Sequence, residues 1–266
     1  MRTSEDFYDA LAPLFDVMTD WEARLAAEEP FLRAALAEAR GKRVLDAACG
    51  SGGHALALAR WGYEAVGADA SPVMVQMARQ KAQAAGLAVP FAVAGLADLP
   101  EVCGPAAFDT VLCLGNSLPH LLTQAELVAA LRATAAALAP GGVFVTQNLN
   151  YDLRWQLQPR WFAAQGDMLD EQEALVWRFA DYDVPAERIA FHIALFRKEL
   201  TGWQVQVHTT PQRPLFQADL LAALAEAGFG EVRSYAGMTA APAPFDPATS
   251  GDLVVTARKI CDSSRR

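Results

Sequence analysis

Short apolar runs alternate with longer segments of helical periodicity between residues 43 and 149. A short apolar run is typical of a buried strand, and apolar residues recurring every turn are typical of an amphipathic helix. We expect strands at Arg43–Ala47, Glu64–Ala68, Val89–Val93, Phe108–Leu114 and Val143–Leu149. We expect helices at Gly52–Arg60, at Pro72–Ala85 and at Thr123–Leu138. This alternation predicts an α/β fold with a parallel, doubly wound sheet.

Local signals support the helix boundaries. Ser71 followed by Pro72 suits an N-cap and a first helical position. Thr123 and Glu126 have the spacing of a capping box. Gly62 lies just past the expected end of the first helix.

The two flanks of this region have different patterns. Residues 4–40 have helical spacing, carried by Phe7, Leu11, Leu14 and Phe15 and by later leucines, and Gly41 closes the segment. After residue 150 we expect antiparallel strands at Leu175–Tyr182, Ile189–Glu199 and Gln204–Thr210, with a tight turn at Thr201-Gly202. A helix at Leu215–Ala227 and strands at Val232–Tyr235 and Asp252–Arg258 then follow, the last two joined by a Pro- and Ala-rich loop.

Three regions follow from this organisation. Residues 1–40 form a helical N-terminal segment, residues 41–150 and 214–260 form the sheet domain, and residues 151–213 form an antiparallel insertion. We expect the N-terminal segment to cover a cofactor and the aromatic-rich insertion to cover a substrate. If the substrate carries a charged amine, the aromatic side chains of the insertion could also make cation–π contacts with it.

Composition narrows the class of protein. The net charge of -9 argues against a nucleic-acid partner, which would need a basic face. The four cysteines show no disulfide-like or metal-like spacing, so no metal is expected. No apolar run is long enough to cross a membrane and no signal peptide is evident, so we expect a cytoplasmic protein without a membrane partner.

The candidate chemistry lies in the turn after the first strand. Asp46 ends that strand, the glycine turn through Gly50 and Gly52 follows, and Asp69 ends the second strand. Glycines let a ligand approach the backbone, and the second acid can hold a ribose diol, so the spacing suits a nucleoside cofactor. Gly50, Gly52 and Ala55 also satisfy a dinucleotide fingerprint, which leaves NAD as an alternative.

Two features favour S-adenosylmethionine (SAM) over NAD. The carboxylate of Asp46 would repel a pyrophosphate but can serve a cationic amine, directly or through water. The chain also ends with two strands joined by a long loop, with no further α-β units. Both features suit a cofactor that carries an ammonium, a sulfonium and an adenosine.

Several segments together resemble the class I SAM-dependent methyltransferases. They are Val44–Gly52, Asp69-Ala70-Ser71, Phe108–Leu114 and Pro140-Gly141-Gly142, and the resemblance covers roughly residues 7–259. Ala48 stands where most members have Gly. The segments at 114–121 and 150–152 resemble those of glycine N-methyltransferases and bacterial glycine/sarcosine methyltransferases. The resemblance implies a Rossmann-like, mostly parallel seven-stranded sheet with an antiparallel insertion after strand five, SAM as cofactor and S-adenosylhomocysteine as product.

The resemblance also implies the cofactor contacts. Gly50 and Gly52 pass the methionine part over the turn, Asp46 holds the amine side, and Asp69 accepts both ribose hydroxyls. Arg24 pairs with the cofactor carboxylate, Tyr8 covers the cofactor, and His120 lies beside it. The remaining implied contacts are Ala47, Ser51, Ala70, Met74, Gly95, Leu96 and Leu114.

Each of these residues also has a structural interpretation. Asp46 could cap the next helix, Met74 could be core, and Arg24 could be solvated. His120 could be a structural histidine, and we expect Trp21 to serve packing.

Acceptor residues are expected after strands four and five. Asn116, Asn150 and Tyr151 follow these strand ends and face the methyl group by topology, and Asn148 lies close by. Asn116, Tyr151 and His120 are our candidates for catalysis, whereas Asp152 is interpreted as a cap. The glycine enzymes of the family carry a basic residue where this chain has Leu149, so glycine is not expected as a good substrate. Arg154 or Arg178 could replace that charge.

The sequence therefore predicts a small-molecule methyltransferase directed at nitrogen. An oxygen acceptor needs a general base, and His120 is the one candidate near the strand ends. The alternatives are a small-molecule O-methyltransferase of secondary metabolism, an NAD-dependent oxidoreductase and a non-catalytic SAM-binding module. The expected partner is a small methyl acceptor, and the expected assembly is a monomer or a homodimer.

Overall fold

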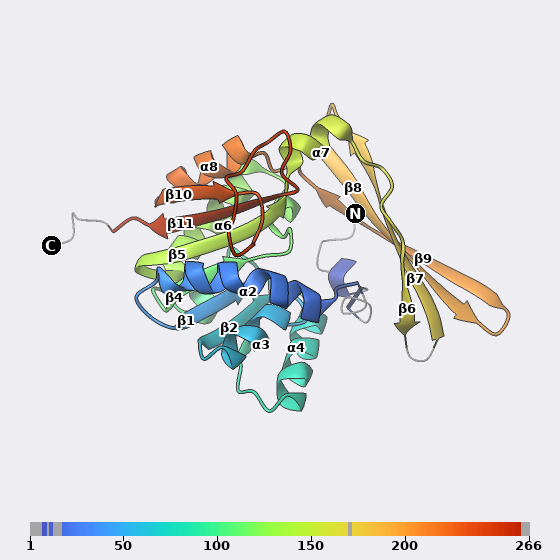
Figure 1. The fold of residues 1–266 in the computed structure, drawn as a ribbon, viewed down its shortest axis with the longest axis horizontal. Coiled ribbons are helices and arrows are strands. Elements are labelled where there is room, and N and C mark those ends of the chain that lie inside the picture. Colours follow the sequence, from blue (N-terminus) through green and yellow to red (C-terminus); the bar gives the residue numbers. More distant parts are fainter. Residues whose placement is uncertain (1–6, 10, 13–17, 170–171, 262–266) are drawn as a thin grey trace.

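A seven-stranded sheet forms the centre of the molecule in a computed structural model that describes residues 7–9, 11–12, 18–169 and 172–261. Its strand order is β10-β11-β5-β4-β1-β2-β3. The strands are β1 (Arg43–Ala47), β2 (Glu64–Asp69), β3 (Phe91–Val93), β4 (Phe108–Cys113), β5 (Leu138–Leu149), β10 (Phe229–Tyr235) and β11 (Asp252–Lys259). β11 runs antiparallel to both β5 and β10, while β1 to β5 pair in parallel. The predicted mostly parallel, seven-stranded sheet is confirmed (Figure 1).

Helices cover both faces of this sheet. They are α2 (Trp21–Ala37), α3 (Gly53–Arg60), α4 (Pro72–Ala84), α5 (Leu99–Cys103), α6 (Gln124–Ala137), α7 (Tyr151–Leu157) and α8 (Gln217–Glu226), with a 3-10 turn η1 (Leu118–His120). Neighbouring residues of one strand lie on opposite faces of the sheet. Val44 packs with the apolar side chains of α2, α3 and α4 on one face. Leu45 packs with those of α5, α6 and α8 on the other. This alternation along the strands gives two apolar cores and makes the sheet doubly wound.

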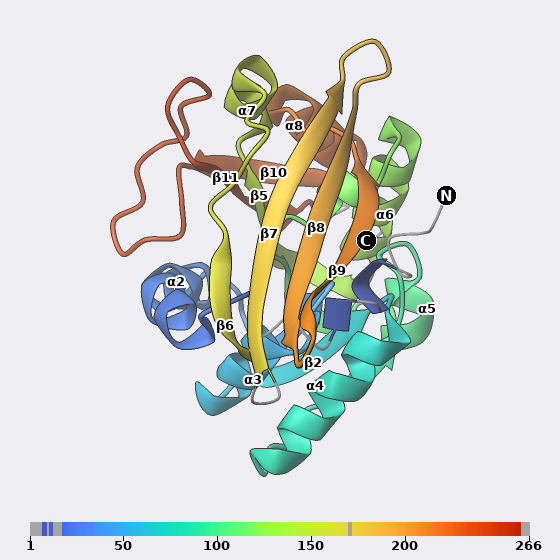
Figure 2. The same cartoon turned by 90° about the vertical axis from the view of Figure 1, so that its right-hand side faces the viewer.

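A second sheet is formed by the insertion. Its strands are β6 (Gln165–Leu169), β7 (Gln172–Asp183), β8 (Arg188–Glu199) and β9 (Gly202–Gln212), all paired antiparallel in chain order. Figure 2 shows these strands face on, in front of the seven-stranded sheet. Val176, Ile193 and Leu195 of this sheet pack with Phe7 and Leu11. The insertion and the N-terminal segment are therefore joined by one apolar cluster.

The structure corrects the N-terminal prediction. A single helical segment over 4–40 is wrong, because Thr19 and Asp20 are not helical and α2 begins only at Trp21. The Asp20 carboxylate accepts the Ala23 N–H and starts α2 there. Residues 7–9 and 11–12 are helical, whereas Leu14 and Phe15 lie outside the described residues.

Other elements differ in extent or are absent from the sequence prediction. β3 begins at Phe91, after Pro90, which has no N–H for a sheet hydrogen bond. β5 begins already at Leu138, which pairs with Phe108. The short elements α5, η1, α7 and β6 were not predicted.

A membrane span or a metal site in the described part of the chain would require a long apolar helix or a cluster of ligand side chains. No helix there is both long and apolar enough to cross a membrane. No group of three His, Cys, Asp or Glu in that part is arranged to hold a metal ion. The cytoplasmic setting and the oligomeric state stay predictions.

Candidate functional site

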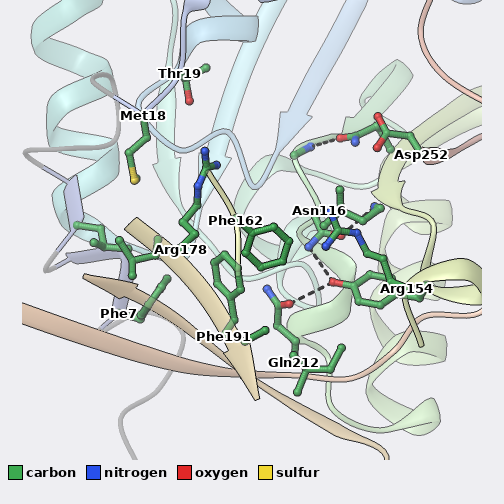
Figure 3. Close-up of a pocket in the computed structure, with 18 of the residues that line it drawn as sticks. Phe7, Met18, Thr19, Asn116, Arg154, Phe162, Arg178, Phe191, Gln212 and Asp252 are labelled. Atoms are coloured by element: carbon green, nitrogen blue, oxygen red, sulfur yellow. Dashed lines mark hydrogen bonds between the residues drawn. The ribbon is translucent and has the colours of Figure 1, made fainter. Parts of the chain in front are cut away.

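Two adjoining cavities lie at the carboxyl ends of the parallel strands. The smaller cavity, of about 250 Å³, is lined by residues that follow β1, β2, β3 and β4 and by α2 and η1. The larger cavity, of about 450 Å³, lies between the insertion, the N-terminal segment and the ends of β4 and β5 (Figure 3). Tyr8, Arg24 and Gly115 line both cavities. A ligand in one cavity can therefore meet a ligand in the other.

The glycine turn forms one wall of the smaller cavity. Ala48, Gly50 and Gly52 have φ angles of 57°, 53° and 84°, in the left-handed region. A Cβ on Gly52 would lie 2.9 Å from the Ala78 Cβ, so no larger residue fits there. The turn is thus tight, and it brings the backbone at Ala48, Cys49 and Gly50 to the cavity wall.

Asp69 holds two loops together at this wall. Its Oδ2 accepts the Gly50 N–H at 2.8 Å and its Oδ1 accepts the Ser71 N–H at 2.9 Å. Burial raises the pKa of Asp69, and these two N–H donors partly oppose that rise. Each carboxylate oxygen has a further lone pair, so the side chain can still accept hydroxyl groups from the cavity.

An apolar slot lies beside Asp69. Ala70, Met74, Ala94, Leu96 and Leu114 line it. Met74 is 1% exposed, so it serves the core and the cavity at once. The slot and the Asp69 carboxylate line the same cavity, an arrangement that suits a flat base attached to a ribose.

Arg24 is fixed in place by a cluster at the start of α2. Its Nε donates to Glu28 Oε1 at 2.9 Å, and Glu28 Oε2 lies 2.7 Å from His54 Nε2. Burial would raise the pKa of Glu28, but the hydrogen bond and charge of His54 and the charge of Arg24 hold it below its usual value. Arg24 Nη2 lies 4.0 Å from the position of a Cβ on Gly115, at the junction of the two cavities.

Trp21 extends this cluster. It packs as predicted, and it also lines the smaller cavity. Its ring meets His54 edge-on with centroids 5.2 Å apart, and Arg24 lies over it at 5.4 Å. A Cβ on Gly53 would lie 2.4 Å from this ring, so the glycine makes room for it. Trp21 and His54 both line the smaller cavity. Sequence reasoning missed His54, although a glycine immediately before it is a signal of close approach.

A chain of polar side chains connects the two cavities. It begins with the Tyr8 hydroxyl, 3.0 Å from His120 Nε2, and His120 also hydrogen-bonds the Pro211 carbonyl. Gln212 Nε2 lies 3.4 Å from His120 Nε2, and Gln212 Oε1 accepts the Tyr151 hydroxyl at 3.1 Å. Tyr151 in turn accepts Asn116 Nδ2 at 3.0 Å. We call these residues (Tyr8, His120, Gln212, Tyr151 and Asn116) the polar chain.

Two residues of the polar chain have settled protonation. Burial lowers the pKa of His120 to about 4, so the ring is neutral at neutral pH. Burial likewise raises the pKa of Tyr151 to about 12, with Asn116 opposing the rise. Asn116 is held at both ends, because its Oδ1 also accepts the Leu149 N–H at 3.0 Å.

Many of the predicted site residues line a cavity. The smaller cavity takes Tyr8, Arg24, Gly50, Asp69, Ala70, Met74, Gly95, Leu96, Leu114 and His120. The larger cavity takes Asn116, Tyr151 and Arg178, and also Leu149 and Arg154.

Four predicted cofactor contacts lie behind the wall instead. They are Asp46, Ala47, Ser51 and Gly52. Asp46 Oδ2 accepts the Ala55 N–H at 3.0 Å, so the structure supports its interpretation as a cap on α3. Ser51 is fully buried and its hydroxyl accepts Lys81 Nζ at 3.0 Å. These four residues do not line the smaller cavity, and their roles toward a cofactor stay predictions.

Two predicted acceptor contacts make hydrogen bonds within the protein, and their roles toward an acceptor stay predictions. Asn150 caps α7 through the Leu153 N–H and donates to the Pro247 and Ser250 carbonyls, so its side chain is fully used in structure. Asn148 is fully buried and donates to Thr146. Neither lines the smaller or the larger cavity. Asp152 does cap a helix, but the helix is α8, through the Gln217 N–H at 3.0 Å.

Several lining residues were missed. Glu28, Gln147, Gln212 and Asp252 contribute to the larger cavity. Asp252 stands at the start of β11, opposite Leu149 at the end of β5. Because β11 runs antiparallel, its first residue reaches the edge at which the parallel strands end. An expected antiparallel last strand could therefore have predicted that Asp252 lies at the site. Burial raises the pKa of Asp252, with Gln147 opposing the rise through a hydrogen bond.

Comparison with known protein families and sequences gives consistent matches. Residues 44–142 match a family model described as a methyltransferase domain. The chain is 29% identical to a glycine/sarcosine N-methyltransferase of Parasynechococcus marenigrum, covering 87% of this chain and 77% of that protein. It is 30% identical to the glycine/sarcosine N-methyltransferase of Halorhodospira halochloris, over 56% of this chain and 55% of that protein. A ubiquinone biosynthesis O-methyltransferase of Xanthomonas euvesicatoria is 35% identical, over 42% of this chain and 45% of that protein.

Solved structures share the whole architecture. A SAM-dependent methyltransferase of Clostridium acetobutylicum superposes with a TM-score of 0.73 and 16% identity, covering 97% of this chain and 99% of that one. The sugar N-methyltransferase KedS8 from Streptoalloteichus superposes with a TM-score of 0.71 and 25% identity, covering 89% of this chain and 88% of that one.

Proposed function

We propose that this chain, which belongs to the class I SAM-dependent methyltransferases, transfers a methyl group to a nitrogen of a small-molecule amine or amino acid. The cofactor is SAM. The nitrogen target and the roles of single residues are part of the proposal.

The smaller cavity fits SAM in its donor and acceptor groups. Asp69 offers carboxylate oxygens for the ribose diol, and the slot at Ala70 and Met74 suits the adenine. Arg24 presents a guanidinium, which matches a carboxylate in shape and charge. Trp21 and Tyr8 supply aromatic walls around the remaining part. The pyrophosphate of NAD fits less well, because an ionised Asp46 under the turn would repel it.

Bound SAM supplies a methyl group on a cationic sulfur that departs readily as a thioether. The protein therefore mainly aligns the acceptor and excludes water. In this chain the insertion and the N-terminal segment close over the larger cavity, and Gly115 lies between the two ligand sites. We assign the alignment of the acceptor to Asn116 and Tyr151, whose side chains are fixed by hydrogen bonds on both sides.

One observation carries the preference for nitrogen. A hydroxyl acceptor needs a general base, and the two carboxylates that line the larger cavity are engaged: Glu28 pairs with Arg24 and His54, and Asp252 is hydrogen-bonded to Gln147. Burial lowers the pKa of His120 to about 4. His120 is also engaged by Tyr8 and the Pro211 carbonyl, so it is a poor proton acceptor. A neutral amine needs only orientation of its lone pair, which amide and hydroxyl groups of the polar chain can provide.

A direct experiment incubates the protein with SAM and matched acceptors that carry a primary amine, a secondary amine or a phenol. Release of S-adenosylhomocysteine gives the rate, and NMR of the product locates the methyl group. The proposal expects methylation on nitrogen. Methylation of the phenol alone would refute methylation on nitrogen and would show that the protein is an O-methyltransferase. Tight binding of SAM with no turnover of any acceptor would favour a binding module.

A further inference from the structure

The larger cavity has two chemically different sides. Figure 3 shows Asn116, Arg154 and Asp252 together on one side and Arg178 on the other, near Met18 and Phe7. Asn116 adjoins Gly115, which also lines the smaller cavity. Asn116 therefore stands at the junction of the two cavities, and Arg178, which lines only the larger cavity, lies across the cavity from it (Figure 3).

Aromatic side chains lie between the two sides. Phe162 and Phe191 meet edge to face with centroids 6.4 Å apart, and both line the cavity. Arg154 lies over the Phe162 ring at 5.2 Å. The volume of about 450 Å³ is in the range of roughly 300–1,000 Å³ that drug-sized ligands occupy. Glycine would leave most of this space and both aromatic walls without contact.

Arg178 lacks a partner of opposite charge in the part of the chain that the structure describes. The one hydrogen bond of its side chain there runs from Nη2 to Gln165 Oε1, at 2.5 Å. The other cations of the cavity are balanced, since Arg24 pairs with Glu28 and Arg154 is attracted to Asp252. Burial lowers the pKa of Arg178, which means that its charge is partly desolvated. A cation in this position is stabilised by an anionic ligand.

We infer that the methyl acceptor is an elongated amine with an aromatic or aliphatic body and a carboxylate at its far end, and that Arg178 binds this carboxylate. The inference rests on the proposed N-methylation and adds the class of acceptor to it. The amine lies near Asn116, the body lies along Phe162 and Phe191, and the carboxylate reaches Arg178. Arg178 is then a specificity-determining residue rather than a catalytic one.

The test compares 4-(aminomethyl)benzoate with benzylamine, which has the same amine and ring but no carboxylate, and with glycine. The kcat/KM for release of S-adenosylhomocysteine is measured for wild type, Arg178→Met, Arg178→Lys and Arg160→Met. Arg160 is the matched control, because it pairs with Asp181 and lines neither cavity. Calorimetry with S-adenosylhomocysteine shows that each variant is folded, since Arg178 does not line the smaller cavity.

The wild type and the Arg160→Met variant should prefer the benzoate over benzylamine by about tenfold or more, as expected for a charge-assisted hydrogen bond. Glycine should be the poorest acceptor. Arg178→Met should reduce the preference to about twofold or less by raising the KM for the benzoate, and Arg178→Lys should keep part of it.

Three results would overturn the inference. They are glycine turned over as well as the benzoate, a preference that survives in Arg178→Met, and no turnover of the benzoate while benzylamine is methylated. In the third case the proposed N-methylation still stands. If none of the three amines is methylated, the inference also fails. Methylation of a phenol in place of every amine would remove the proposed function itself.

Discussion

Asp69 is the residue on which the cofactor assignment depends most. Its carboxylate accepts N–H groups from both Gly50 and Ser71 and still faces the smaller cavity. The spacing of Asp69 from the glycine turn was visible in the sequence, because both positions follow strand ends that are neighbours in the sheet.

Replacing Asp69 with Ala should weaken binding of S-adenosylhomocysteine by at least about tenfold, since charge-assisted hydrogen bonds to the ribose are lost. Titration calorimetry measures this affinity. Asp98→Ala is the matched control, because Asp98 is an exposed acid on the next loop and lines neither cavity. Equal affinities of Asp69→Ala and the wild type would refute the ribose role.

Tyr151 tests the orienting role of the polar chain. Its hydroxyl is bonded to both Asn116 and Gln212, and the side chain is 2% exposed. Tyr151→Phe should lower kcat by about tenfold, because Asn116 loses the partner that fixes it, and should cost about 1–3 kcal/mol of unfolding free energy from unpaired polar groups. Affinity for S-adenosylhomocysteine should not change, because Tyr151 lines only the larger cavity.

Steady-state kinetics with an amine that the protein methylates measures kcat, and calorimetry measures the affinity for S-adenosylhomocysteine. Tyr63→Phe is the control, since Tyr63 packs against the core away from both cavities. A loss of cofactor affinity equal to the loss in kcat would argue against an orienting role.

At the scale of elements, the glycine turn between β1 and α3 carries local strain. Ala48 has a φ of 57°, where glycine is tolerated and an L side chain costs about 1–2 kcal/mol. Ala48→Gly should therefore raise the unfolding free energy by about 0.5–1 kcal/mol, after the greater freedom of glycine in the unfolded chain is subtracted.

Ala47→Gly provides the opposite case one residue earlier. Ala47 belongs to β1, is fully buried and has no positive φ. The unfolding free energy of this variant should therefore fall by about 1 kcal/mol or more. Urea unfolding of both variants gives the comparison. Destabilisation of Ala48→Gly to the same degree as Ala47→Gly would show that the turn is not strained.

The start of α3 should make stability depend on pH. Burial raises the pKa of Asp46 to about 6, above its usual 3.8. Between about pH 4 and pH 6 the unfolded state loses this proton before the folded state does, so the ionisation of Asp46 lowers stability as pH rises through this window. Well above pH 6 Asp46 is ionised in both states, and stability no longer changes with pH through this group.

Asp46→Asn removes this titration and keeps an acceptor for the Ala55 N–H. The unfolding free energy of the variant relative to wild type should rise by on the order of 3 kcal/mol between pH 4 and pH 7. Urea unfolding at both pH values measures it. The same difference at both pH values would contradict the assignment.

Elements differ in how well the sequence predicted them. β1 was predicted with its observed bounds, because a buried parallel strand is a continuous apolar run. β6 was missed because it depends on pairing with β7 at the edge of the second sheet rather than on its own pattern. α7 was missed because its start relies on Asn150, whose side chain also holds the distant loop at Pro247 and Ser250.

At the scale of the whole molecule, the site is an assembly of distant segments. The smaller cavity was foreseen because its main residues follow strand ends within one βαβ unit. The larger cavity combines the N-terminal segment, the insertion and β11, whose contact is set by packing and strand register. Glu28 and Gln212 could not be placed at this cavity from spacing alone.

We propose that the two cavities are the cofactor and acceptor halves of one methyl-transfer site. A crystal structure with S-adenosylhomocysteine bound would show whether they are. We expect the ribose at Asp69, the adenine beside Ala70 and Met74, and the sulfur at the junction formed by Tyr8, Arg24 and Gly115, open toward the larger cavity. A sulfur that points away from the larger cavity, or a ribose away from Asp69, would show that the two cavities do not form one site.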